Sequence, residues 1–239
     1  MLVLMPGLRE HVKLSSEITD MLIADAVLTI AFALLYSGGV GGLRYDWKGF
    51  FYFLPISFMA VSLAFILHEY MHKVVAQRFG AIAAFKRWDS GIMITLASSL
   101  FGFLIGLPGA TMIYTNRFTE REDGLVSLAG PLTNFAVFIA FMAIGIIANS
   151  YFVVGKYIND AIGVTLFISV WLAFFNMLPI YPLDGSKVLR WNKKVYAITM
   201  VVIFGFLYYI AGAAILPELA FALVIAFVFS VIYSGMRMF

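Results

Sequence analysis

Long apolar runs dominate this sequence and limit what the chain can fold into. A helix needs roughly 20 apolar residues to cross the hydrocarbon core of a bilayer, because each residue adds only about 1.5 Å of length. Six runs read as such spans: 21–37, 50–67, 125–148, 162–178, 195–216 and 219–231. Only 12% of the 239 residues are charged, against roughly 25% in soluble domains. The sequence predicts a polytopic α-helical membrane protein, with one domain over residues 1–239.

A seventh apolar run, 91–107, is shorter and rich in glycine and serine. Cytoplasmic loops of membrane proteins carry an excess of Lys and Arg. If this run crosses the bilayer, the 16 Lys and Arg residues divide seven against nine; if it enters and leaves on one side, they divide thirteen against three. We therefore predict six transmembrane helices, cytoplasmic termini, and a re-entrant or β-hairpin element between spans two and three. We expect this element to be buried against those two spans.

Residues 68–72, at the end of the second run, read His-Glu-Tyr-Met-His. Histidines four positions apart lie on one face of a helix, so His68 and His72 can bind the same zinc ion. Glu69 can then reach the open position of the metal and act as general base and acid in peptide hydrolysis. A chance match is expected on the order of once in a hundred chains of this length. Two histidines and a carboxylate in a membrane helix also cost free energy unless they have partners.

A catalytic zinc site needs a third protein ligand, because two histidines leave it incomplete. His11 is the only other histidine, and we interpret it as a surface residue of the polar N-terminal arm. Asp184 follows two prolines and precedes Gly185, so its carboxylate is expected on irregular backbone at membrane depth. A turn or helix-cap aspartate is the alternative. The six-span topology places the ends of spans two and four on the same side, and we favour Asp184 as the third ligand.

The chain resembles the site-2 protease family of intramembrane zinc metalloproteases. The matching motifs are residues 68–72, the stretch 129–134 (Ala-Gly-Pro-Leu-Thr-Asn) and the stretch 176–185, which ends in Leu-Asp-Gly. The resemblance implies one zinc ion held by His68, His72 and Asp184, with Glu69 as the catalytic acid-base. It also implies that Asn134 and Asn176 assist substrate or oxyanion binding, although hydrogen bonding between helices is as good a reading. A membrane-embedded β-hairpin is expected at 105–114.

The expected function is intramembrane zinc endopeptidase activity on transmembrane protein substrates, in regulated intramembrane proteolysis. The protein is then a multi-pass protein of the cell membrane, with its active site near the cytoplasmic side. The chain has no cysteine, so a thiolate metal site and a cysteine nucleophile are excluded. Its net charge of +3 is spread over short connectors, which gives no indication of nucleic acid binding. A catalytically silent zinc-binding scaffold and an ion-coupled transporter are the alternatives.

Overall fold

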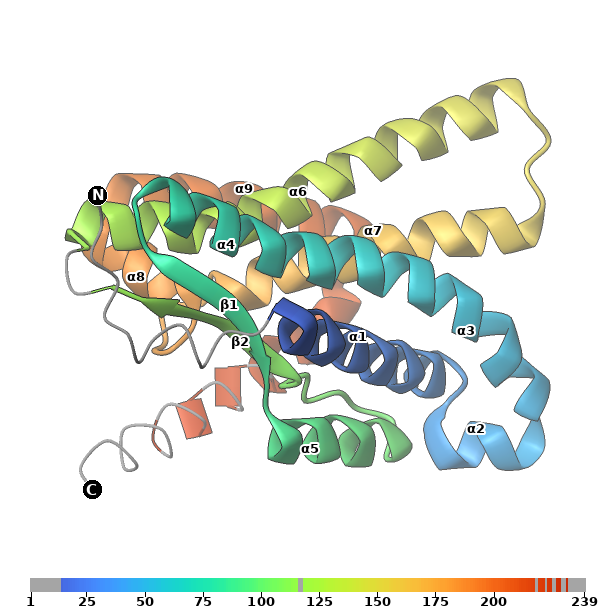
Figure 1. Ribbon diagram of the computed structural model, residues 1–239. Coiled ribbons are helices and arrows are strands. Elements are labelled where there is room, and N and C mark those ends of the chain that lie inside the picture. The colour runs from blue at the N-terminus through green and yellow to red at the C-terminus, as the bar shows by residue number, and fades with distance from the viewer. Residues whose placement is uncertain are drawn as a thin grey trace. The chain divides into compact units, whose positions relative to one another are not determined.

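The computed structural model describes residues 14–115, 118–217, 219–221, 223, 224, 227, 228 and 231. Helices form most of this part of the chain, and two short strands lie between them (Figure 1). In chain order the elements are α1 (Leu14–Tyr36), α2 (Gly39–Tyr45), α3 (Trp47–Val61), the π-helix η2 (Ser62–Ile66), α4 (Leu67–Arg78), β1 (Ile82–Arg87), α5 (Asp89–Leu100), β2 (Gly109–Tyr114), α6 (Glu120–Tyr151), α7 (Lys156–Asn176), α8 (Asp184–Trp191), α9 (Lys193–Ala211) and the 3-10 helix η3 (Gly212–Ile215).

Within the described residues, five helical segments are long and apolar enough to cross a membrane. They are Ser16–Tyr36, Trp47–Arg78, Glu120–Tyr151, Lys156–Asn176 and Lys193–Ile215. Each covers all or nearly all of one of the first five apolar runs of the sequence, and the chain is a polytopic helical membrane protein. The sixth expected span, 219–231, is described only in part and stays a prediction.

The chain divides into two compact units. The first comprises Met1–Phe58 and Gly80–Thr115, and the second comprises Met59–Phe79 and Asn116–Phe239. The second unit therefore contains the His-Glu-x-x-His stretch, the Ala-Gly-Pro stretch and Asp184 together.

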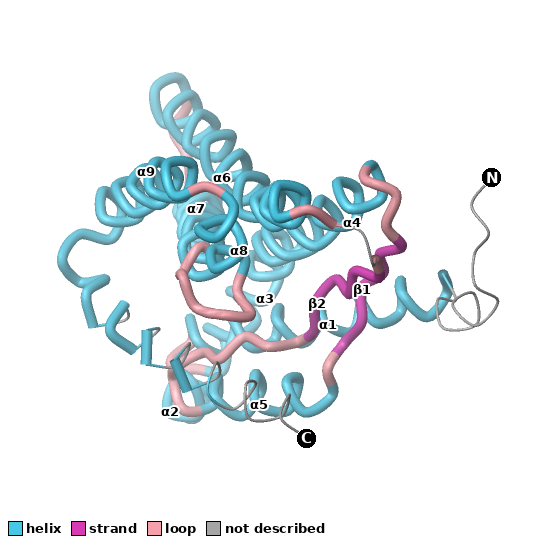
Figure 2. Tube along the Cα trace, turned by 90° about the vertical axis from the view of Figure 1, so that its left-hand side faces the viewer, coloured by secondary structure: helices cyan, strands magenta, loops and turns pink. Residues whose placement is uncertain are grey.

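In the first unit, β1 and β2 form a two-stranded antiparallel sheet, drawn in magenta in Figure 2. Ile82 lies opposite Tyr114 and Arg87 opposite Gly109, so the strands pair over their full lengths. Helix α1 packs against β1, and the buried carboxylate of Glu17 accepts a hydrogen bond from the backbone N–H of Phe85 at 3.1 Å. The sheet lies between the second and third apolar spans in sequence. It is formed by 82–87 with 109–114, so the expected hairpin within 105–114 is wrong: Gly109 begins a strand there.

Residues 88–108 leave the end of β1 and return to the start of β2. The backbone N–H of Trp88 donates to Pro108 O at 2.9 Å, and this hydrogen bond joins the two ends of the segment. Hydroxyls of α5 hold the returning segment: Thr95 Oγ1 donates to Ile105 O and accepts from Leu107 N–H, both at 3.0 Å. Helix α5 packs against α1 in this unit. The expectation that this segment packs against spans two and three stays a prediction, because span three belongs to the other unit.

In the second unit, α6 and α7 run side by side as a long antiparallel pair, and α4 and α8 pack against α6 (Figure 1). Helix α6 begins with a capping box, in which Thr119 and Glu122 bond reciprocally to each other's backbone N–H groups. Buried side chains from α6, α7, α8 and α9 form a common core that includes Phe138, Met177, Val188 and Leu207. This core fixes α6 relative to the segment that carries Asp184.

Candidate metal centre

Helix α4 brings its two histidines together. His68 and His72 lie four positions apart, both buried, and their Nε2 atoms are 2.9 Å from each other. The turn before α4 is the π-helix η2, which packs against α6 and α7. Single π-helical turns change the register of the residues that follow, and they are frequent at functional sites. Here the register change falls directly before the two histidines.

Asp184 reaches the same point from a different part of the chain. Its Oδ2 lies 3.1 Å from His72 Nε2 and 3.5 Å from His68 Nε2. Asp184 is the first residue of α8, whose N-cap is Leu183, so its carboxylate is not used as a helix cap. A Cβ on Gly185 would lie 2.1 Å from Met177 O, so glycine is required for the connection from α7 to fold back this tightly. The expected meeting of these three residues is observed.

The far end of α8 is anchored to α6. Arg190 pairs with Asp123, with 2.6 Å between Nη2 and Oδ2. The ring of Trp191 packs against Gly124, where a Cβ would come within 2.7 Å of it. These contacts hold α8, which begins with Asp184, against α6, the helix whose residues contact both histidines.

The three side chains fit a zinc ion. Ligand atoms about 2.0 to 2.2 Å from zinc in tetrahedral positions lie about 3.3 Å from one another, and the three observed separations run from 2.9 to 3.5 Å. Burial raises the pKa of the Asp184 carboxyl, but the neighbouring His72 and hydrogen bonds from both histidines lower it by more. The pKa of Asp184 therefore lies below its usual range. Two histidines and one carboxylate are a ligand set of catalytic zinc sites, which keep a fourth position for water or substrate.

Gly130 of α6 leaves room at this site. A Cβ at this position would lie 2.5 Å from His72 Nε2 and 2.6 Å from His68 Nε2. Any side chain would therefore intrude where the two histidine nitrogens converge. Sequence reasoning noted Gly130 in the Ala-Gly-Pro motif but gave it no role, because its importance depends on how closely α6 approaches α4.

Helix α6 also supplies partners for the Nδ1 atoms of the histidines. His72 Nδ1 lies 2.7 Å from Val126 O, and His68 Nδ1 lies 3.1 Å from the amide of Asn134. Pro131 lies within this helix and has no N–H, so it cannot donate the usual helical hydrogen bond to the carbonyl of Ser127. The Val126 carbonyl was missed in the sequence, because a backbone acceptor has no signature there.

The remaining candidate residues are placed as follows. Glu69 is buried next to His68 on α4. Asn176 ends α7 and donates its amide N–H to Leu172 O at 3.0 Å; no hydrogen bond between described residues links it to the metal-binding side chains. Asp89, on α5 in the other unit, is paired with Arg87 at 2.9 Å. His11 lies outside the described residues.

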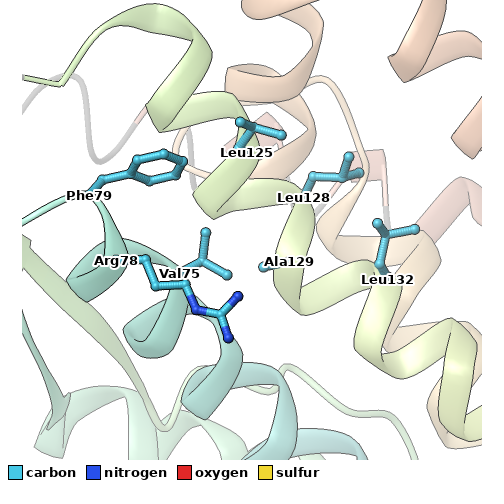
Figure 3. A pocket seen from close by; sticks show the side chains of 7 residues that line it. All are labelled: Val75, Arg78, Phe79, Leu125, Leu128, Ala129 and Leu132. Carbon is cyan, nitrogen blue, oxygen red and sulfur yellow. The ribbon is translucent and has the colours of Figure 1, made fainter.

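An open apolar hollow lies between α4 and α6 (Figure 3). Val75, Leu125, Leu128 and Ala129 line it, and the Arg78 guanidinium lies at its side. None of the three metal-binding residues lines it, and its apolar walls offer no metal ligand. The chemistry of the second unit is therefore concentrated at the His68–His72–Asp184 cluster.

A helical membrane protein with this ligand set fits the class of membrane zinc metalloproteases. The chain is 41% identical over 156 residues to "Putative zinc metalloprotease MJ0611" of Methanocaldococcus jannaschii, a match that covers 64% of this chain and 79% of that protein. It is 29% identical over 162 residues to "Putative zinc metalloprotease YwhC" of Bacillus subtilis, covering 59% of this chain and 72% of that protein. The chain belongs to this family of zinc metalloproteases, and its cofactor is zinc. No family model and no solved structure matches it.

Proposed function

We propose that this protein is an intramembrane zinc endopeptidase of the site-2 protease type, which hydrolyses peptide bonds within or near the transmembrane segments of other membrane proteins. One observation carries the proposal. The histidines of the zinc site lie on Trp47–Arg78, a helical segment apolar enough to cross the bilayer, and they are completed by Asp184. A protease that acts on soluble substrates does not need its metal ligands in such a segment, where each polar group costs free energy.

The residues of this chain can divide the reaction between them. Bound zinc would polarise the carbonyl of the scissile bond and make water a better nucleophile at neutral pH. Glu69 takes a proton from the attacking water and gives it to the leaving amine, as general base and then general acid. His68, His72 and Asp184 hold the metal, and Gly130 keeps the space beside it clear.

A substrate helix must be opened before it can be cut. In lipid, its backbone amides are bonded within the helix and shield the scissile carbonyl. The sheet of the first unit has two strands in the described residues, so β2 has no partner strand along its second edge. An unwound substrate segment can pair there by strand addition, as the resemblance to site-2 proteases implies. Substrates with helix-weakening residues near the cut bond are therefore favoured.

The proposed topology makes the run 91–107 re-entrant. Phe79 and Phe118 flank this stretch, and their ring centroids are 6.4 Å apart. The helix before the stretch therefore ends where the helix after it begins. Together with the thirteen-to-three charge division, this supports cytoplasmic termini and a site near the cytoplasmic face of the cell membrane. The segment would enter and leave the bilayer on that side.

The experiment that tests this function compares the wild type with Glu69→Gln. We expect Glu69→Gln to abolish cleavage of a single-span membrane substrate while one zinc ion per chain is retained, because glutamine cannot transfer the proton. Loss of a general base typically costs 10² to 10⁴ in rate. Cleavage is measured by gel analysis of the substrate in liposomes, and zinc by elemental analysis of the same samples.

The outcomes separate the alternatives. A silent zinc scaffold predicts no cleavage by either protein, and an ion-coupled transporter predicts zinc-dependent ion flux without products. Wild-type rates in Glu69→Gln would overturn the role given to Glu69.

A further inference from the structure

The environment of His68 contains a polar contact that the proposed reaction does not use. Asn134 is fully buried on α6, and its carboxamide lies 3.1 Å from His68 Nδ1. The opposite ring nitrogen, Nε2, is the one that faces Asp184 and the other histidine. Asn134 therefore contacts the back of a metal ligand rather than the space in front of the metal.

The chemistry of a zinc-bound imidazole decides which end of the carboxamide must face the ring. A neutral histidine that binds metal through Nε2 carries its hydrogen on Nδ1, and that hydrogen needs an acceptor. His72 meets this requirement, because its Nδ1 lies 2.7 Å from Val126 O. For His68 the equivalent acceptor is the carbonyl oxygen of the Asn134 side chain.

The carboxamide can present this oxygen to His68 by turning about its own bond. In the structure its nitrogen faces His68, and its oxygen is buried without a hydrogen-bond partner among the described residues. The two ends of a carboxamide are nearly the same size, so a half turn of the group exchanges them. When zinc is bound, the Nδ1–H of His68 would face the N–H of the Asn134 amide, and two donors cannot bond. The half turn replaces this pair by an N–H···O hydrogen bond from His68 to Asn134.

We propose that Asn134 is a positioning residue for zinc: its amide oxygen accepts the Nδ1 hydrogen of His68 and so fixes the tautomer and orientation of this ligand. The inference rests on the zinc site of the proposed function. It gives Asn134 a role behind the ligand, in place of the oxyanion role that the family resemblance implies. Outer partners of this kind typically contribute 10- to 100-fold to metal affinity.

Two substitutions with opposite hydrogen-bonding properties test the proposal. Asn134→Ala removes the acceptor, and we expect zinc affinity to fall by roughly 10- to 100-fold. Asn134→Asp keeps an acceptor but has no donor, and we expect it to hold zinc at least as tightly as the wild type. Zinc affinity is measured by competition with a chromogenic chelator on the purified full-length protein in detergent.

Thr133→Ala is the matched control. Thr133 precedes Asn134 on the same helix, but its hydroxyl donates to Ala129 O in its own helix, so zinc affinity should be unchanged. The proposal is overturned if Asn134→Ala binds zinc like the wild type, or if Asn134→Asp binds as weakly as Asn134→Ala. Should Asn134→Ala fail to elute as a folded protein, the Asp variant decides: wild-type affinity supports the proposal, and weakened affinity overturns it.

A second measurement distinguishes positioning from a direct catalytic role. At saturating zinc, the Ala variant should cleave with a wild-type rate per bound zinc ion, because only the affinity depends on Asn134. A large loss of rate at full occupancy would instead assign Asn134 to the oxyanion and overturn the positioning role. The zinc measurement needs no cleavage, so failure of the protease proposal leaves it interpretable.

Discussion

At the scale of single residues, the metal centre depends on one glycine as much as on its ligands. Gly130 lies where a Cβ would come within 2.6 Å of the Nε2 atoms of His68 and His72. Both histidines are buried on a packed helix, so neither can move away freely. The site therefore requires a residue without a side chain on α6 as well as the two imidazoles on α4.

Gly130→Ala is expected to weaken zinc binding by at least roughly tenfold, since the methyl group displaces the two ligands from their positions. Gly163→Ala provides the control, because a Cβ at Gly163 of α7 would meet nothing within 4 Å. Zinc content after dialysis against a chelator is the measurement. Equal zinc retention by the two variants would contradict the close approach of α6 to the metal.

Asp184→Ala is expected to lose zinc under the same chelator challenge, because two histidines alone make an incomplete tetrahedral site. Asp160→Ala removes a carboxylate that pairs with Lys156 on α7, and should retain zinc like the wild type. Full zinc retention by Asp184→Ala would show that another residue is the third ligand. His11 and Asp89 would then be tested in its place.

Sequence reasoning found the ligands but not their surroundings. His68 and His72 are evident because helix periodicity alone places them together, and Asp184 is marked by the prolines and glycine around it. Gly130 and the Val126 carbonyl became visible only in the structure, because their roles are set by the distance between two helices. No local pattern encodes that distance.

At the scale of elements, the described spans follow the apolar runs closely, whereas the short strands do not. Five apolar runs correspond to five long helices, because 20 apolar residues in lipid have few alternatives to a helix. Strand β1 has six residues, and its partner begins 22 positions after β1 ends, so pairing has no local sequence signal. Thr95 and Ser98 of α5 stabilise the returning segment through side-chain hydrogen bonds that are equally non-local.

The re-entrant path of 91–107 is testable because the chain has no cysteine of its own. Single cysteines are placed at Gln77 and Arg121, exposed residues on either side of the stretch, and at Val153, which is fully exposed between α6 and α7. With an impermeant thiol reagent on oriented vesicles, we expect the first two positions to react from one side and Val153 from the other. Reaction of the first two from opposite sides would exclude a re-entrant path.

At the scale of the whole molecule, the protein belongs to a family of zinc metalloproteases and consists largely of membrane helices. We propose that the bond cut at this zinc site lies within or beside the apolar span of another protein. A metal centre on Trp47–Arg78 gives the physical reason, because ligands on a membrane-spanning helix act where the substrate is also in lipid.

Mass spectrometry of the products tests this claim most directly. The zinc-loaded protein is reconstituted in liposomes with a single-span substrate that carries a helix-weakening residue in its span, and Glu69→Gln is run in parallel. We expect a new terminus within or beside the apolar segment, formed only by the wild type and lost when zinc is removed. Termini confined to the soluble flanks of the substrate, or the same terminus in the Glu69→Gln sample, would contradict the account.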